Sequence, residues 1–261
     1  NRKHVDGLET PFIQSVFNLW RLRKWAPSEA VGAVRGQSPA EIPDVVVERL
    51  PHYLRALRAL RDEGTEVVSS QELGEALSVT PAQIRKDLSY FGRFGKQGRG
   101  YSVPHLVLDL TRILGLERAW PVILIGAGRL GQAIVTYPGF TPEGFHIQAA
   151  FDTDEAVIGT HIADIEVRPV GEVQKYVRQK GIEIAIVAVP GEQAQSVIDG
   201  LIRVGIRAIM NYAPSNPRVP NGVRVRTIDP VQALQTMTFH LTDQRHPEQP
   251  AAPKPASAGP R

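Results

Sequence analysis

The sequence of 261 residues contains no cysteine. This absence excludes disulfide bonds, thiol-based redox sensing, cysteine-ligated zinc and iron–sulfur clusters. The seven histidines show no i,i+4 pair and no ligand spacing, so we expect no metal site. No apolar run approaches the roughly 20 residues of a membrane-spanning helix, and the N-terminal FIQSVFNLW segment makes a poor signal peptide. We therefore expect a cytoplasmic protein.

The net charge is also small, because 30 lysines and arginines are nearly balanced by 27 acids, which gives a formal net charge of +3. The charge is concentrated, however, between Ala82 and Tyr101, where one anion, Asp87, accompanies five cations. A local excess of this kind attracts the phosphate backbone of a nucleic acid. The five cations are Arg85, Lys86, Arg93, Lys96 and Arg99.

Composition divides the chain into five parts. Residues 1–43 form an N-terminal extension that we expect to be poorly ordered, and the tail 244–261, rich in proline and alanine, should be disordered. Residues 44–118 show helical spacing followed by a glycine-rich loop. Residues 119–228 alternate short β-branched runs with helical segments, which indicates an α/β fold with a parallel sheet. Residues 229–243 form a closing helix.

The first folded part contains two helix-start signals in close succession. Ser69 and Glu72 have capping-box spacing, and Thr80 followed by Pro81 marks a second helix start. Two short helices separated by SVT predict a helix-turn-helix. The second helix presents side chains that suit base edges and phosphates outward, namely Gln83, Arg85, Lys86 and Ser89.

The loop that follows, GRFGKQGRGY, predicts the β-hairpin wing of a winged helix. Its glycines permit tight turns with positive φ, and Arg93, Lys96 and Arg99 would project toward DNA. Capped short helices and solvated charge runs are also common in proteins that bind no nucleic acid, so the helix pair alone does not establish DNA binding.

The second folded part begins with a dinucleotide-binding signature. The glycines of Gly126-x-Gly128-x-x-Gly131 follow an apolar strand and open a helix, and the next strand ends in Asp152. An acid there can bind both ribose hydroxyls and would repel a 2′-phosphate, so the sequence favours NAD(H) over NADP(H). The pyrophosphate would lie on the turn and the helix N-terminus. The whole turn comprises Gly126, Ala127, Gly128, Arg129, Leu130 and Gly131.

No catalytic set accompanies this predicted cofactor site. Tyr176 and Lys180 mimic a dehydrogenase pair, but they lie on a helix too early in the sheet to face a nicotinamide. The loops predicted at that edge, which contain Val189, Pro190 and Asn211, are mostly apolar and could wall the ring without reacting. The oxidised ring is positively charged and the reduced ring is neutral, so an apolar wall favours NADH. These features indicate a sensor and not an enzyme.

Several motifs in this order resemble the Rex family of redox-sensing transcriptional repressors. They are SSQELGEALSVTPAQIRKDLSYFG, GAGRLG with Tyr137 and Pro138 after it, FDTD, IVAVP, NYAP and TIDPVQALQ. The resemblance implies a homodimer bound to double-stranded operator DNA at low NADH and released when NADH binds. It also implies a closing helix exchanged between subunits, with a buried stripe of Val231, Leu234, Met237, Thr238 and Leu241.

The resemblance further implies that Tyr137, Arg55 and Asp229 couple nicotinamide binding to domain closure, with Arg55 pairing with Asp229 of the other subunit in one state. Without it, Arg55 is an exposed helix position and Asp229 is the N-cap of the closing helix. The sequence departs from the usual family pattern at Gln97 and Arg99, at Tyr212 and at Pro230.

Two other classes of function stay open at this stage. One is an NAD-dependent oxidoreductase whose basic loop binds an acidic substrate, against which the missing catalytic set argues. The other is a module that binds CoA or another nucleotide, because related dinucleotide-binding domains bind CoA.

Overall fold

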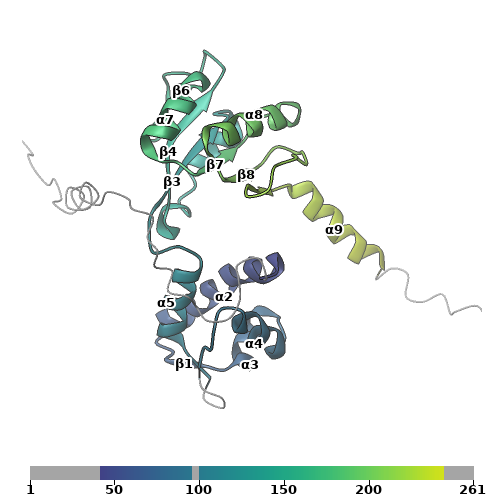
Figure 1. Cartoon of the computed structure of the whole chain (residues 1–261). Helices are drawn as coiled ribbons and strands as arrows, with labels where there is room; N and C mark the ends of the chain where they lie inside the picture. Colours follow the sequence, from purple (N-terminus) through teal and green to yellow (C-terminus); the bar gives the residue numbers. More distant parts are fainter. Residues whose placement is uncertain (1–41, 96–99, 244–261) are drawn as a thin grey trace, which may run out of the picture. The chain divides into compact units, whose positions relative to one another are not determined.

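The computed structural model describes residues 42–95 and 100–243. The chain divides into two compact units between Gly115 and Leu116, a few residues before the boundary expected after residue 118. Each unit is described by itself (Figure 1). The expectations for the N-terminal extension up to residue 41, for Lys96 and Arg99, and for the tail 244–261 lie outside the described residues.

In its described residues, the first unit contains four helices and a small two-stranded sheet. Helices α2 and α5 pack against each other, and α3 and α4 form the second helix pair. The elements are α2 (Asp44–Asp62), β1 (Val67–Val68), α3 (Ser70–Leu77), α4 (Pro81–Ser89), β2 (Tyr101–Ser102) and α5 (Val103–Ile113).

Both helix starts predicted for the helix-turn-helix are confirmed. The hydroxyl of Ser69 accepts a hydrogen bond from the backbone N–H of Glu72 at 3.1 Å, and the Glu72 carboxylate accepts one from the backbone N–H of Ser69 at 2.7 Å. These two bonds make the capping box that opens α3. The Thr80 hydroxyl accepts from the N–H of Gln83 at 3.2 Å, and Pro81 opens α4.

The loop predicted as a wing lies partly outside the described residues, and its strand pairing involves a segment that the sequence did not predict. Strand β2 does not pair with a strand just before the glycine loop; it pairs antiparallel with β1, which precedes the two short helices. Described residues 91–95 belong to no strand. Gly92 and Gly95 have φ of 134° and 84°, positive values that glycine adopts readily, as predicted for this loop. A Cβ at Gly95 would lie 2.5 Å from the carbonyl oxygen of Gly100, so the two sides of the loop lie close together.

The second unit is built on a seven-stranded sheet in the order β5-β6-β4-β3-β7-β8-β9. All neighbours pair in parallel except β5, which is antiparallel at the edge. The six parallel strands have the order of a doubly wound dinucleotide-binding sheet, whose switch point lies between β3 and β7. The strands are β3 (Trp120–Ile125), β4 (Phe145–Asp152), β5 (His161–Ile162), β6 (Ile165–Pro169), β7 (Ile184–Val187), β8 (Ala208–Asn211) and β9 (Arg224–Thr227).

The β-branched runs VILIG, FHIQAAF, IEIAIVAV, IRAIMNYA and VRVRTI, which the sequence predicts as strands, correspond to β3, β4, β7, β8 and β9. The parallel strand β6 was not predicted. Only Ile165 and Val167 supply apolar side chains in it, and they alternate with Glu166 and Arg168. Strands toward the edge of a sheet commonly carry such charges, which hides them from a search for apolar runs.

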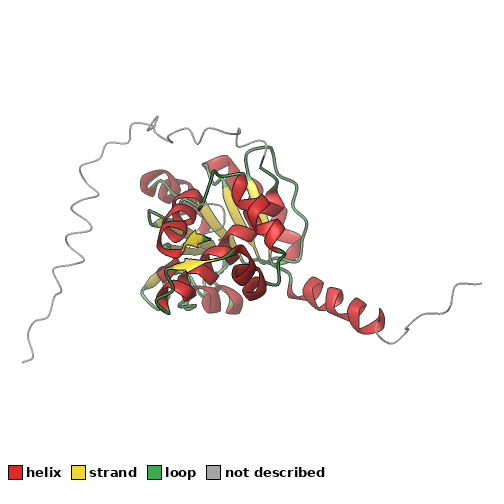
Figure 2. Cartoon of the chain, turned by 90° about the horizontal axis from the view of Figure 1, so that it is seen from below, coloured by secondary structure: helices red, strands yellow, loops and turns green. Residues whose placement is uncertain are grey.

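Helices cover both faces of this sheet (Figure 2). Ile134 of α6 packs on one face with Val122 and Leu124 of β3, whereas α7 and α8 pack on the other face with Ile123 and Ile125. Burial on both faces explains why β3 is apolar throughout. The helices are α6 (Arg129–Val135), η2 (Thr141–Glu143), η3 (Val170–Glu172), α7 (Val173–Lys180), α8 (Gly191–Val204) and α9 (Pro230–Asp243). None of the described helices is long and apolar enough to cross a membrane.

Two glycines inside helices give a matched test of the packing. A Cβ at Gly74 of α3 would lie 2.5 Å from the carbonyl oxygen of Val79, whereas a Cβ at Gly200 of α8 would find its nearest neighbour at 3.7 Å. We expect Gly74→Ala to lower the free energy of unfolding by about 1–3 kcal/mol through overpacking. Gly200→Ala should raise it by about 0.5–1 kcal/mol through helix propensity. Urea unfolding followed by circular dichroism measures both, and equal changes of one sign would contradict this account.

Candidate cofactor cleft and DNA-binding surface

The glycine turn after β3 brings the helix α6 directly onto the end of the strand. Gly126 has φ of +97°, and a Cβ there would lie 2.5 Å from the carbonyl oxygen of Ala188. A Cβ at Gly131 would overlap the carbonyl oxygen of Gly126, whereas a Cβ at Gly128 would meet nothing within 4 Å. Gly126 and Gly131 are thus required by the fold itself, and Gly128 leaves open space in front of the turn.

Asp152 lies at the end of β4 beside this turn. Its Oδ2 atom accepts a hydrogen bond from the backbone N–H of Ala127 at 2.6 Å, and its Oδ1 atom accepts from the N–H groups of Thr153 at 2.7 Å and Asp154 at 3.0 Å. Three backbone donors therefore fix the carboxylate. A carboxylate has about four lone-pair sites, so one is left for a hydroxyl donor.

A cleft opens at this edge of the sheet, at the switch point between β3 and β7. A cavity of about 180 Å³ is lined by Gly126, Gly128 and Asp152 on one side and by Val189 and Pro190 on the other. The predicted wall residues Val189 and Pro190 thus lie beside the glycine turn. In this class of sheet, ligands bind at the carboxyl ends of the strands, at such a switch point.

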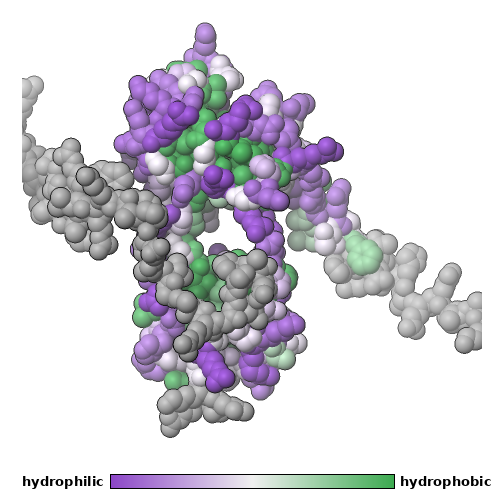
Figure 3. Space-filling view, viewed as in Figure 1, coloured by the Kyte–Doolittle hydropathy of each residue, from purple (hydrophilic) through white to green (hydrophobic). Residues whose placement is uncertain are grey.

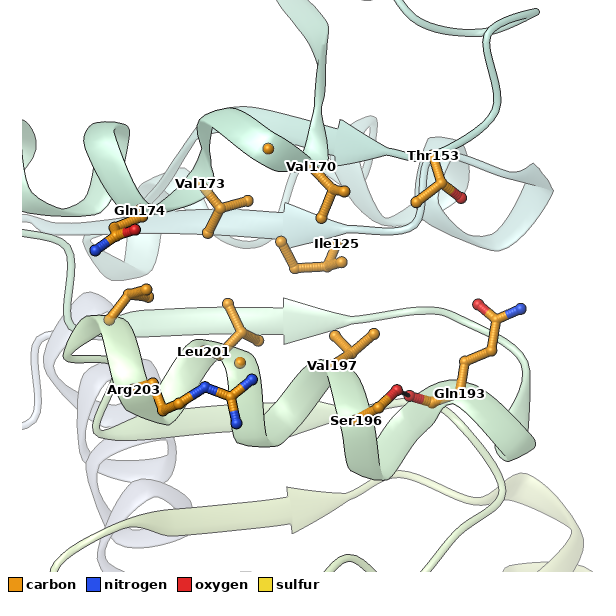
Figure 4. A pocket seen from close by; sticks show the side chains of 13 residues that line it. Ile125, Thr153, Val170, Val173, Gln174, Gln193, Ser196, Val197, Leu201 and Arg203 are labelled. Carbon is orange, nitrogen blue, oxygen red and sulfur yellow. Dashed lines mark hydrogen bonds between the residues drawn. The ribbon is translucent and has the colours of Figure 1, made fainter.

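The cleft continues into a groove of about 760 Å³ between α7 and α8 (Figure 4). The cavity and the groove share Ile125, Thr153, Val170, Gln193 and Val197. Apolar side chains gather on this surface of the second unit (Figure 3). The groove runs along the sheet face from Thr153 and Gln193, near the carboxyl ends of the strands, toward Gln174 and Arg203 (Figure 4). Only the end that it shares with the cavity lies at the switch point, where ligands bind in this class of sheet.

Asn211, also predicted at the cofactor site, is not among the residues that line the cavity. It is fully buried, and its Nδ2 atom donates to Ala213 O at 3.0 Å, to Ser215 Oγ at 3.2 Å and to Thr227 Oγ1 at 3.3 Å. Its Oδ1 atom accepts from the N–H of Ala213 at 3.1 Å. Both amide hydrogens are used, one lone pair of Oδ1 accepts a bond, and the Asn211 side chain holds the loop after β8. That Asn211 also contacts the cofactor stays a prediction.

Two tyrosines lie on the face of the sheet that α6 covers. Tyr137 is exposed and meets Phe140 edge-to-face, with ring centroids 5.3 Å apart. Tyr212 packs against the same cluster of buried side chains as Phe140 and Ala188. Burial raises the pKa of the Tyr212 phenol, and the Tyr137 phenol raises it further. Arg129 and Leu130, at the start of α6, are exposed.

Tyr176 has a packing role. Its hydroxyl donates to the carbonyl of Gln148 at 3.2 Å, and its ring meets Phe151 edge-to-face at 5.6 Å. Burial raises the pKa of this phenol. Tyr176 is thus a half-buried packing residue of the sheet. Among the described residues, no group of three or more acids or histidines could hold a metal ion.

The outer surface of α4 is basic. Arg85, Lys86 and Ser89 are exposed on this helix, and Arg93 is exposed just after it. The Arg85 guanidinium donates to the hydroxyl of Ser70 at 2.8 Å, which ties the helix surface to the start of α3. Lys96 and Arg99 of the predicted set lie outside the described residues.

Gln83 differs from this outward set, because its amide donates to Asp87 Oδ1 at 2.6 Å. Asp87 is fully buried and also accepts hydrogen bonds from Arg49 at 2.6 and 2.8 Å and from Tyr53 at 2.6 Å. Burial alone would raise the pKa of Asp87, but these hydrogen bonds outweigh it and hold the pKa below its usual value. The single anion counted in the basic segment is thus neutralised inside the fold.

The two residues expected to couple the units lie at simple local positions. Arg55 is exposed on α2. The Asp229 carboxylate accepts a hydrogen bond from the N–H of Val231 at 2.9 Å, which confirms it as the N-cap of α9, with Pro230 as the first helical residue.

Comparison with known proteins identifies the family. The family model described as "Putative DNA-binding protein N-terminus" matches residues 41–89, and the CoA binding domain model matches residues 117–215. The redox-sensing transcriptional repressor Rex of Chloroflexus aurantiacus is 55% identical over 205 residues, which are 78% of this chain and 97% of that protein. The chain belongs to the Rex family.

Solved structures of a Rex-family repressor, RSP, agree with this assignment. RSP in complex with β-NAD⁺ and operator DNA matches with a TM-score of 0.75 and 39% identity, covering 78% of this chain and 94% of that chain. RSP in complex with β-NADH matches with a TM-score of 0.71 and 37% identity, covering 78% and 96%. The CoA binding domain model matches within the second unit and does not by itself select a ligand.

The glycine turn gives a second matched test. We expect Gly131→Ala to lower the free energy of unfolding by about 1–3 kcal/mol, because its methyl group would overlap a backbone carbonyl. Gly128→Ala should change it by less than about 0.5 kcal/mol, because its methyl group enters open space. Gly128→Ala should nevertheless weaken NADH binding about tenfold or more, since that space admits the pyrophosphate. Thermal unfolding and an NADH fluorescence titration separate the two effects; NADH affinity unchanged in Gly128→Ala would oppose the cofactor role.

Proposed function

We propose that this Rex-family chain is a DNA-binding repressor that senses the NADH/NAD⁺ ratio, with its second unit binding the dinucleotide and its first unit binding operator DNA. The observation that carries the proposal is the combination, in one chain, of a capped helix-turn-helix with a basic outer surface and a dinucleotide cleft. This combination spans nearly the whole length of relatives named redox-sensing transcriptional repressors.

In the proposed complex, the turn from Gly126 to Gly131 and the N-terminus of α6 hold the pyrophosphate. Asp152 binds the adenosine ribose, and its negative charge disfavours NADP(H). Val189 and Pro190 wall the nicotinamide end. Tyr137, on the α6 side of the sheet, is a further proposed cofactor contact. Asp229 is included among these contacts because of the family resemblance.

The apolar cleft supports a preference for NADH. Oxidation gives the nicotinamide ring a positive charge, and burying an unpaired charge among apolar side chains costs free energy that the neutral reduced ring does not incur. We propose that the protein regulates and does not catalyse: none of the described cleft residues forms a His–carboxylate pair, and Tyr176 is committed to packing.

On the DNA side, Arg85 and Lys86 project from α4 toward the major groove, and Ser89 and Arg93 contact phosphates. Lys96 and Arg99 belong to the same proposed set. A repressor of this kind acts where the chromosome lies, so a cytoplasmic location is part of the proposal.

We propose further that the protein acts as a homodimer that exchanges α9. Four of the five residues of the expected stripe, namely Val231, Leu234, Met237 and Leu241, are large apolar side chains, and all four are more than half exposed. A row of exposed apolar side chains on one helix calls for a partner surface. In this dimer Arg55 would pair with the partner's Asp229, as the family resemblance implies.

The ribose role of Asp152 gives a direct test. Asp152→Asn should weaken NADH binding about tenfold, because it removes a charge-assisted hydrogen bond, and it should weaken NADPH binding less or strengthen it. Asp154→Asn is the matched control, since the Asp154 carboxylate bonds only the N–H of Ala156 among the described groups. Titration of both cofactors measures the ratio. An unchanged NADH affinity in Asp152→Asn, with an unchanged preference over NADPH, would remove Asp152 from the site.

The sensing function is tested by a gel-shift titration on DNA enriched for inverted repeats. We expect NADH to release the protein at concentrations where NAD⁺ has little effect, and an inverted repeat to bind more tightly than a single half-site, as a dimer requires.

Arg85→Ala or Lys86→Ala should weaken operator binding about tenfold and leave NADH affinity unchanged. Arg112→Ala, a cation of α5, serves as the control.

Three results would contradict the proposal in different ways. Binding that neither nucleotide disturbs would leave a DNA-binding protein without a sensor. Release by CoA, with none by NADH, would select the CoA module. The absence of specific DNA binding, with steady turnover of NADH and a small carbonyl compound, would select an oxidoreductase.

A further inference from the structure

Helix α4 is joined to α2 by four polar side chains, which we call the α2–α4 cluster: Arg49, Tyr53, Gln83 and Asp87. Asp87 is its centre and is 0% exposed, whereas the Arg49 side chain is 26% exposed. Arg49 and Tyr53 come from neighbouring turns of α2, and Gln83 and Asp87 come from neighbouring turns of α4.

The Asp87 carboxylate in this cluster is saturated. Arg49 donates through Nε to Oδ2 at 2.6 Å and through Nη2 to Oδ1 at 2.8 Å. Tyr53 donates to Oδ2 and Gln83 to Oδ1, each at 2.6 Å. These four bonds fill the four lone-pair sites of a carboxylate. Asp87 therefore has no capacity for an outside ligand, and its function lies within the unit.

Apolar packing alone fixes the orientation of α4 poorly. This helix has nine residues, too few to be stable in isolation, and its buried apolar side chains are Ile84 and Leu88. Apolar contacts are non-directional, so a short helix on two such side chains can rotate or slide. A two-pronged Arg–carboxylate pair is planar and sets both rotation and register.

We propose that the α2–α4 cluster aligns α4 for operator binding, and that Gln83 is a positioning residue and not a reader of base edges. The inference rests on the proposed function, because it assumes that α4 is the helix that enters the DNA. It replaces the sequence-based role of Gln83, whose amide is used within the fold. A buried ion pair often adds little to stability and serves instead to specify one arrangement.

The decisive experiment compares operator profiles of variants. Gln83→Met, Tyr53→Phe and Arg49→Met each remove donors to Asp87 and keep most of the side-chain volume. Each should weaken binding to the best operator about tenfold. The ranking of all single-base operator variants should stay as in the unsubstituted protein, and NADH affinity should stay within about twofold. Arg61→Met, an exposed arginine of the same helix, should change none of these quantities.

A change of base preference at one operator position in Gln83→Met would overturn the inference, because only a base reader shifts the ranking. Operator affinity unchanged in both Gln83→Met and Tyr53→Phe would also overturn it. The two conservative variants keep the test valid even if Arg49→Met fails to fold with Asp87 left unpaired.

A second measurement does not depend on DNA and separates this inference from the proposed function. In Tyr53→Phe and Gln83→Met, amide hydrogen exchange of α4 should become about tenfold faster, while exchange in the core of α5 stays unchanged. Unchanged exchange in α4 would show that apolar packing suffices. If the unsubstituted protein binds no DNA, the proposed function fails, and the exchange result still decides whether the cluster holds α4.

Discussion

The second unit depends on one close approach: the first turn of α6 lies so near the end of β3 that only glycine fits at position 131. This contact lets the helix begin directly after a three-residue turn, with its N-terminus aimed at the switch point of the sheet. The turn in turn offers the N–H of Ala127 to Asp152, which orients the acid at the end of the neighbouring strand. The positions of β3, the glycine turn, α6 and Asp152 therefore depend on one another.

Much of this arrangement could be predicted because its parts have short-range signals. The glycine spacing, the apolar β3 strand and the acid after β4 are local patterns, and so are the capping residues Ser69 and Thr80. Strand β6 escaped prediction because its side chains alternate between apolar and charged residues. Its place in the sheet is set by pairing with β4, a contact that no local pattern encodes.

Two polar side chains make hydrogen bonds within the fold that the sequence did not predict. Asn211 and Gln83 are polar residues at positions where polar residues often meet ligands, yet both are committed within the fold. Their partners are brought to them by tertiary structure: Thr227 comes from β9 and Asp87 is held by α2. For Gln83, the sequence carried one signal. Arg49 and Tyr53 are spaced to lie on one face of α2, and Asp87 is the single acid of the otherwise basic α4. A single sequence does not show which helices will face each other.

The separation of the two sites constrains how sensing can work. The cofactor cleft lies within the second unit and the basic surface of α4 within the first. The residues of one site alone therefore cannot link cofactor binding to DNA binding. Coupling is a free energy shared by both ligands, and it must act equally in both directions. Under the proposed function, coupling requires exposed residues outside the two cores, whose contacts differ between the DNA-bound and the NADH-bound protein. Arg55 meets that requirement on the first unit, because it is exposed on α2, the helix whose Arg49 and Tyr53 hold α4. A change in the contacts of Arg55 would shift α2, and because Arg49 and Tyr53 lie on the same helix, it would also shift the hydrogen bonds that hold α4.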